Sequence, residues 1–158
     1  MNVRLAALIL AFAVAVSPLA AAQDKAADVT DVQALRDAVR ADKRAYVTSL
    51  MKFTDAEAKR FWPIYESYQR NLAVTNRERA VAVQEFMFRD KPLTNLAAKQ
   101  YANRLLALDE AEIKARRTMR NRVMRVLPAV KAARYMQLEQ KINAVQDYDL
   151  AVAVPLVR

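Results

Sequence analysis

Apolar residues recur every three or four positions over a stretch of about 35 residues, which is the strongest constraint on the fold. At its start, Thr54 can cap a helix, Glu57 can reach back to it, and Phe53 can act as a hydrophobic staple. The pattern predicts one long helix of about 50 Å that ends near Arg89. Its apolar positions are Ala58, Phe61, Tyr65, Tyr68, Leu72, Ala82 and Phe86.

Proline marks two further features of the helical pattern. Pro63 lies inside the long stretch, so we expect either a kink near residues 59–63 or a short helix followed by a longer one. Pro128 can be the first residue of a later helix. Helices are also expected from a capping box at Thr30–Gln33 to about Met51, from the cap candidate Thr94 to about Leu127, and from Pro128 to about Val145.

The two long helices have interrupted apolar stripes, which favours an open arrangement over a compact bundle. We expect an all-α fold of four helices, two of them long, in an elongated or cradle-like bundle. A second copy of the chain, in a homodimer, can cover the apolar residues left outside. Polar residues on the stripes are Thr75, Arg79, Glu112 and Arg122, and apolar residues off them are Val74, Val81, Met87 and Phe88.

The N-terminus has the layout of a secretory signal peptide. A basic start precedes an apolar run of 12 residues from Leu5 to Val16, and Ala20-Ala21-Ala22 offers a cleavage site. The run is short for a membrane span, so cleavage is preferred over an uncleaved anchor. The expected parts are a signal peptide at 1–22, a flexible leader at 23–30, one helical domain at 31–150, and an apolar tail at 151–158, either extended or frayed.

Three residue types are absent, and each absence excludes a class of chemistry. There is no Cys for a disulfide framework, no His for acid–base or transition-metal chemistry, and no Gly for phosphate-binding loops or nucleophile elbows. We therefore expect no enzyme, no catalytic residues, no cofactor and no metal site. The scattered methionines are read as core residues.

The formal net charge of +9 predicts anionic partners. An exported chain rarely meets nucleic acid, so we expect acidic or unfolded proteins, with weak contact to anionic lipid as a further option. The densest basic segment, Lys114–Arg125, holds six cations and no acid. Arg116, Arg117, Arg120 and Met124 are its candidate binding residues, with Met119 and Val123 as apolar groups among the charges. A solvated helix face or a membrane-surface helix are the alternatives.

A second candidate surface is the run Phe86-Met87-Phe88. Three large apolar side chains in a row cannot all face one core from a helix. At least one of them should be exposed, either to contact a client protein or to form a dimer contact.

The chain also carries an internal echo at an offset of 74 residues. Each copy opens a helix with an apolar residue and continues in the same small–basic–aromatic–aliphatic order, which indicates an architectural repeat. The matched pairs are Phe53 with Leu127, Ala58 with Ala132, Arg60 with Arg134, Phe61 with Tyr135, and Ile64 with Leu138.

With these two helix starts, the chain resembles the Spy/CpxP family of periplasmic proteins, marked by two LTxxQ motifs. Phe53, Thr54 and Glu57 stand for the first motif, with Phe for Leu and Glu for Gln, and only Leu127 is kept in the second. The resemblance implies a thin, curved four-helix cradle that pairs as an antiparallel dimer and binds unfolding envelope proteins without ATP. Other members report envelope stress to a membrane sensor kinase.

The expected function is therefore a periplasmic, ATP-independent chaperone that uses a basic and partly apolar helical face. The alternative is a regulatory partner that inhibits a membrane sensor kinase in an envelope-stress response. An envelope-surface protein held by anionic lipid is a third class.

Overall fold

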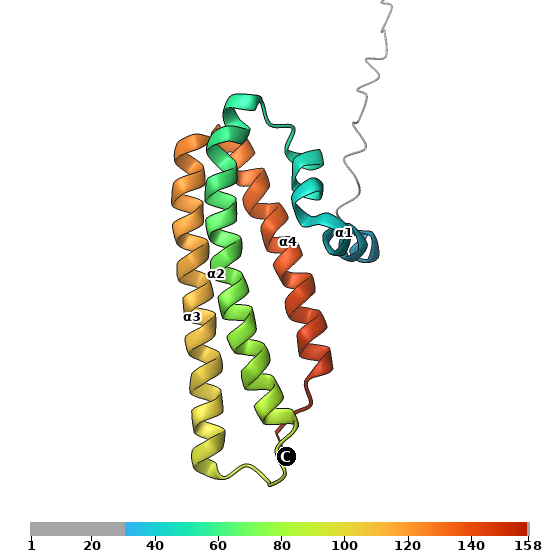
Figure 1. The fold of residues 1–158 in the computed structure, drawn as a ribbon, viewed down its shortest axis with the longest axis vertical. Coiled ribbons are helices and arrows are strands. Elements are labelled where there is room, and N and C mark those ends of the chain that lie inside the picture. The colour runs from blue at the N-terminus through green and yellow to red at the C-terminus, as the bar shows by residue number, and fades with distance from the viewer. Residues whose placement is uncertain (1–30, 158) are drawn as a thin grey trace, which may run out of the picture.

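The computed structural model describes residues 31–157, and four helices account for most of them (Figure 1). They are α1 (Val32–Met51), α2 (Asp55–Met87), α3 (Asn95–Val126) and α4 (Ala129–Ala153). No strand occurs between residues 31 and 157, so the expected all-α class with two long helices is confirmed. The predicted signal peptide and leader lie outside the described residues.

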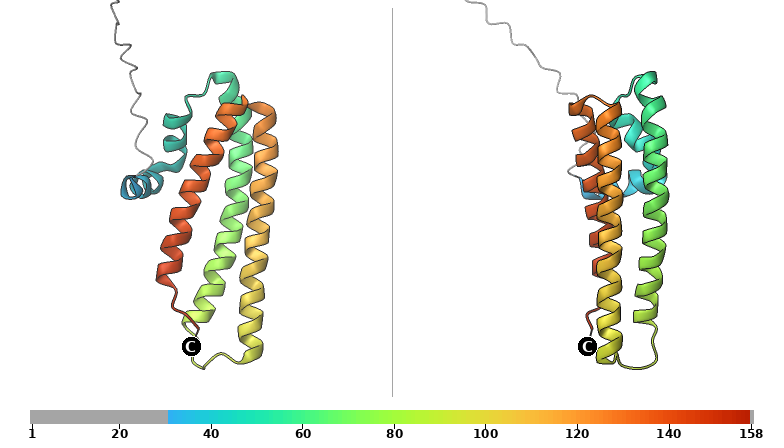
Figure 2. Two further views of the ribbon diagram at one scale, coloured as in Figure 1. Left: turned by 180° about the vertical axis from the view of Figure 1, so that it is seen from behind. Right: turned by 90° about the vertical axis from the view of Figure 1, so that its left-hand side faces the viewer.

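The two long helices α2 and α3 form an antiparallel hairpin, and α4 returns beside them (Figures 1 and 2). Helix α4 is shorter and ends before the hairpin tip, which is the loop between α2 and α3. Helix α1 packs on α4 near the end where α2 begins. The bundle therefore has four helices at one end and a two-helix tip at the other.

The start signals work largely as the sequence predicts. Thr54 accepts a hydrogen bond from the Glu57 backbone N–H at 3.3 Å, and the Glu57 carboxylate accepts one from the Thr54 N–H at 2.8 Å. Thr94 caps α3 by accepting from the Ala97 N–H at 3.2 Å. At α1, however, the cap is Asp31 instead of Thr30, and its carboxylate accepts from two backbone N–H groups.

Helix α1 contains a break that the apolar pattern does not show. Asp42 has an extended backbone (φ −164°, ψ 98°), and its carboxylate accepts from the Ala45 N–H at 2.9 Å. Asp42 thus caps the second half of α1, which changes direction at this point. The helix ends at Lys52, whose left-handed conformation (φ 46°) turns the chain toward α2.

The proline predictions are partly wrong. Helix α2 is one element across Pro63, so the split into a short and a longer helix does not occur. Pro63 is exposed, so water can reach the carbonyl that loses its partner. Pro128 is the residue before the first helical residue of α4. Helix α4 also continues through Ala151 to Ala153, so the extended tail begins only at Val154.

The main hydrophobic core fills the four-helix end. Its centre is an aromatic cluster in which Phe61 meets Tyr135 edge-on, with ring centroids 4.8 Å apart, and stacks obliquely on Phe53 at 4.5 Å. Towards the hairpin tip the buried apolar residues are fewer, because α1 and then α4 no longer cover the hairpin. The core residues are Leu35, Val47, Met51, Phe61, Ile64, Tyr65, Tyr68, Leu72, Met119, Val123, Leu127, Ala132, Tyr135, Leu138 and Ile142.

The internal echo corresponds to a structural repeat. Helices α2 and α4 begin at Asp55 and Ala129, which are equivalent positions in the echo, and both run from the four-helix end towards the tip. The equivalent rings of Phe61 and Tyr135 touch each other. The two copies of the pattern thus form two helices that begin at equivalent positions and bring equivalent residues into contact.

Candidate binding surface

The basic segment Lys114–Arg125 forms the second half of α3, and its side chains divide between core and surface. Met119 and Val123 are buried; Met119 still lies beside three of the arginines, whereas Val123 belongs to the core alone. They point into the core because they continue the apolar stripe of α3 at four-residue spacing. Arg122 is exposed and does not interrupt that stripe, contrary to the sequence-based expectation.

The predicted arginines line a groove between α3 and α4 with a volume of about 380 Å³. We call it the α3–α4 groove. Helix α3 supplies the cations, and α4 supplies polar and apolar groups from the facing side. The lining residues are Ile113, Arg116, Arg117, Met119, Arg120, Met136, Glu139 and Gln140.

Arg116 is held in place from inside the bundle. Its Nη2 lies 2.5 Å from Glu112 Oε1, and it also hydrogen-bonds the Tyr68 hydroxyl. Desolvation by burial opposes its charge, but these hydrogen bonds prevail and raise the pKa of Arg116 above its usual value. Its buried Nε has no hydrogen-bond partner in the described chain. Arg116 is therefore a wall of the groove that Glu112 holds in position.

Arg117 and Arg120 differ from Arg116, because both are exposed and neither forms an ion pair with any residue from 31 to 157. Ile113 and Met124, four residues before Arg117 and four after Arg120, are 54% and 46% exposed. Residues at these three- and four-residue steps share one helix face. Helix α3 thus presents an outward stripe in which two uncompensated cations lie between two apolar side chains.

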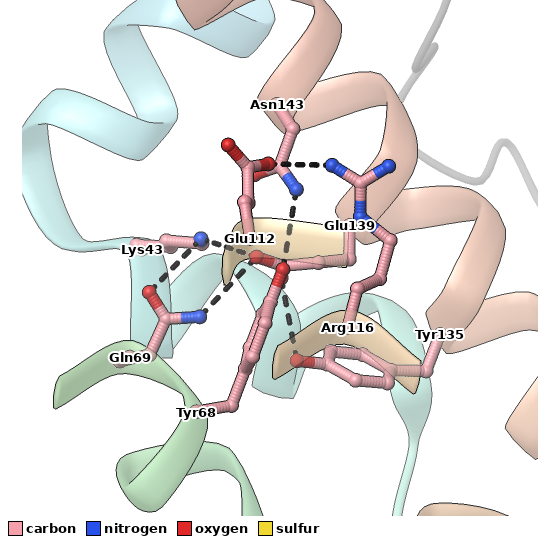
Figure 3. A network of polar contacts seen from close by, with 8 residues as sticks. All are labelled: Lys43, Tyr68, Gln69, Glu112, Arg116, Tyr135, Glu139 and Asn143. Atoms are coloured by element: carbon pink, nitrogen blue, oxygen red, sulfur yellow. Dashed lines mark hydrogen bonds and ion pairs between the residues drawn. The ribbon is translucent and has the colours of Figure 1, made fainter. Parts of the chain in front are cut away.

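A buried polar network lies behind the groove (Figure 3). The Glu139 carboxylate is 1% exposed and accepts hydrogen bonds from Lys43 Nζ at 2.7 Å, Gln69 Nε2 at 3.2 Å and the Tyr135 hydroxyl at 3.3 Å. Nearby, Asn143 donates to the Tyr68 hydroxyl at 3.3 Å. Because Lys43 neutralises Glu139, this carboxylate does not cancel the positive field of Arg117 and Arg120.

The run Phe86-Met87-Phe88 does not join this surface. Phe86 is buried and stacks on Tyr101, with ring centroids 4.8 Å apart and planes 12° apart. Met87 and Phe88 are 42% and 77% exposed at the C-terminal end of α2, by the hairpin tip. The structure therefore separates the two predicted surfaces, and Phe86 is a packed residue.

The four motif residues serve the fold. Phe53 packs on Phe61 and Trp62, Thr54 and Glu57 form the capping box, and Leu127 is buried at the α3–α4 connection. None of these four residues lines the α3–α4 groove.

Sequence reasoning missed Ile113, Met136 and Gln140, which line the groove. Ile113 offered a usable signal, because it lies seven residues before Arg120 and off the buried stripe. Met136 and Gln140 gave none, since their place in the groove follows from the packing of α4 beside α3.

Among residues 31–157, no group of three or more acidic side chains is placed to hold a metal ion. Nor does any described helix carry an apolar stretch long enough to cross a bilayer. In comparisons with known proteins, no family model, no curated protein and no solved structure matches the chain. The resemblance to the Spy/CpxP family therefore stays a prediction.

Proposed function

We propose that this protein is an ATP-independent binding protein that holds acidic, partly unfolded polypeptide segments on the α3 stripe and the α3–α4 groove. The observation that carries the proposal is the exposed stripe of α3, in which Arg117 and Arg120 lie between Ile113 and Met124. It combines long-range attraction with short-range apolar contact on one face.

Each part of the stripe supplies a different kind of interaction. Uncompensated Arg117 and Arg120 attract acidic chains over about a Debye length, ~8 Å at physiological salt. Ile113 and Met124 add apolar burial of ~25 cal/mol per Å², and the flexible thioether adapts to varied sequences. Contacts of this size are weak singly, so a segment that folds withdraws its apolar side chains and leaves without any nucleotide cycle.

The proposed setting is the periplasm, with the signal peptide removed. The main core fills only the four-helix end, and the α2–α3 hairpin extends beyond it. Both features suit the cradle-like shape that the family resemblance implies. In the proposed homodimer, the exposed side chains of Met87 and Phe88 contribute to the contact between copies.

An aggregation assay tests the proposal with a chemically unfolded acidic exported protein as client. The double variant Arg117→Gln/Arg120→Gln should lose most of the suppression seen with the unchanged protein. The matched control is Arg122→Gln/Arg125→Gln, which removes the same charge from exposed positions of α3 outside the groove. No suppression by the unchanged protein at equimolar ratio, or equal loss in both double variants, would contradict the proposal.

The second candidate is a dedicated regulator that inhibits a membrane sensor kinase. The exposed part of the Arg116 side chain favours it, because a cation that Glu112 already holds in position suits one defined partner. A pull-down from an envelope extract separates the two functions. One stoichiometric partner that Arg116→Lys releases supports the regulator, whereas many substoichiometric partners support the chaperone.

A further inference from the structure

The hairpin tip contains a pocket that is separate from the α3–α4 groove. Its volume is about 430 Å³, within the range of about 300–1,000 Å³ typical of small-molecule sites. All its lining residues lie between Ala82 and Arg104, so α1, α4 and the C-terminal tail do not contribute. We call it the tip pocket.

One side of the tip pocket is aromatic. The stacked rings of Phe86 and Tyr101 bring α2 and α3 together there, and Ala97, Pro92 and Leu93 extend the apolar lining. Tyr101 is half-buried, so part of its ring stays accessible, whereas Phe86 is buried. This wall suits a flat apolar body of about one ring.

The other side of the tip pocket is cationic. The Arg89 guanidinium lies over the Phe86 ring, 4.3 Å from its centroid, and donates to the Phe86 carbonyl. It is half-buried and forms no ion pair with a described carboxylate, which leaves most of its five N–H donors available. Arg89 is thus a fixed cation at a cavity wall, as needed to bind an anion.

The remaining charges around the pocket also favour an anion. Lys91 is exposed at the rim and has no acidic partner in the described part of the chain. Glu85, the one carboxylate of the lining, lies 2.6 Å from Arg104 and is neutralised by it. Thr94 caps the N-terminus of α3 and lines the pocket, so the positive end of the α3 helix dipole lies at the same pocket.

We infer that the tip pocket binds a small aromatic carboxylate, with its ring against Tyr101 and its carboxylate between Arg89 and Lys91. The ring matches the aromatic wall, and the carboxylate matches a guanidinium that is already held in position. This site does not depend on polypeptide binding at the α3–α4 groove.

Titrations followed by ¹⁵N amide shifts test the inference with the full mature chain. The probes are phenylacetate, phenylacetamide and acetate, which separate the contributions of ring and charge. Phenylacetate should bind saturably below ~10 mM, with shifts confined to residues 82–104, and at least about tenfold more tightly than the other two. Equal binding of acid and amide, no saturable shift, or shifts centred on the α3–α4 groove would overturn it.

Two variants complete the test. Arg89→Gln should weaken phenylacetate binding about tenfold, whereas Arg117→Gln, which lies in the other site, should not change it. Unchanged phenylacetate binding in a folded Arg89→Gln variant would overturn the assignment. A short peptide ending in phenylalanine carries the same chemistry, and tighter binding of that peptide would assign the pocket to chain ends instead.

Discussion

Lys131 Nζ lies 2.6 Å from Glu57 Oε2, and the two residues occupy equivalent positions of the 74-residue repeat. Near the starts of α2 and α4, equivalent positions of the repeat face each other. At Phe61 and Tyr135 this produces a ring contact, and at Glu57 and Lys131 it produces an ion pair because the two copies carry opposite charges. Lys131 also donates to the Lys52 carbonyl at 3.0 Å, which ties the start of α4 to the end of α1.

The Glu57–Lys131 pair predicts a loss of stability in acid. Hydrogen bonds from Lys131 and from the Thr54 backbone hold the pKa of Glu57 below its usual value. The folded protein therefore binds fewer protons than the unfolded chain as pH falls below about 4.3. The stabilisation is complete above that pH and is lost as pH falls through the folded-state pKa.

Urea unfolding of Lys131→Met between pH 3 and 7 measures this effect. The variant should be less stable than the unchanged protein at pH 7, and the difference should shrink at the acid end. Lys141→Met, at an exposed position of α4, is the control and should show neither change. A difference that stays constant with pH would contradict the assignment to Glu57.

The buried Glu139 carboxylate predicts a large penalty when its cation is removed. Lys43→Met should cost about 3 kcal/mol, at the low end for a broken buried pair because Gln69 and Tyr135 still donate to Glu139. The double variant Lys43→Met/Glu139→Met should recover most of the loss, since no buried charge is left. Chemical denaturation measures both, with exposed Lys59→Met as the control. An additive double variant would show that the two residues are not coupled.

Buried tyrosines predict instability in alkali. Desolvation raises the pKa of Tyr65 to about 12, and desolvation together with the nearby Glu139 carboxylate also raises the pKa of Tyr135. Since the unfolded chain ionises near pH 10, stability should fall as pH rises above that value. An absorbance titration should show that a fraction of the tyrosines ionises only above about pH 10. The Tyr65→Phe variant should lose part of that fraction. Complete ionisation near pH 10 in folded protein would contradict this.

Exposed Phe88 predicts a self-association contact. Phe88→Ser should leave the free energy of unfolding of the monomer unchanged within about 0.5 kcal/mol, because the ring is 77% exposed. It should lower the dimer fraction in sedimentation velocity. Val130→Ser, at an exposed position of the opposite end, is the matched control. An equal dimer fraction in all three proteins would exclude Phe88 from the contact.

Periodicity and caps predicted the helices well because both are local. The stripe from Phe61 to Phe86 and the caps at Thr54 and Thr94 act through neighbours three or four residues away. The break at Asp42 was missed because an aspartate within a helical pattern has no distinct apolar signature. Residues Ala151–Ala153 were predicted as tail but are helical, because Pro155 disfavours helix only at itself and at the residue before it.

The candidate site was predicted less completely because it depends on pairing between helices. From the sequence, Arg116, Arg117 and Arg120 were predicted to be equivalent binding residues. In the structure Arg116 differs from the other two, because Glu112 and Tyr68 interact with it from the core side. That distinction requires knowing which residues of α2 and α3 meet. The tip pocket was missed for the same reason, since Arg89 and Tyr101 come together only through the turn of the hairpin.

The concentration of the core at one end gives the molecule an uneven resistance to opening. The α2–α3 hairpin is secured where α1 and α4 cover it, while its distal turns, with the stacked rings of Phe86 and Tyr101, lie outside the main core. Amide protons there should therefore exchange through local fraying at a fraction of the global unfolding free energy. Any molecule seated between Arg89 and Tyr101 would stiffen this distal arm without altering the protection of the core.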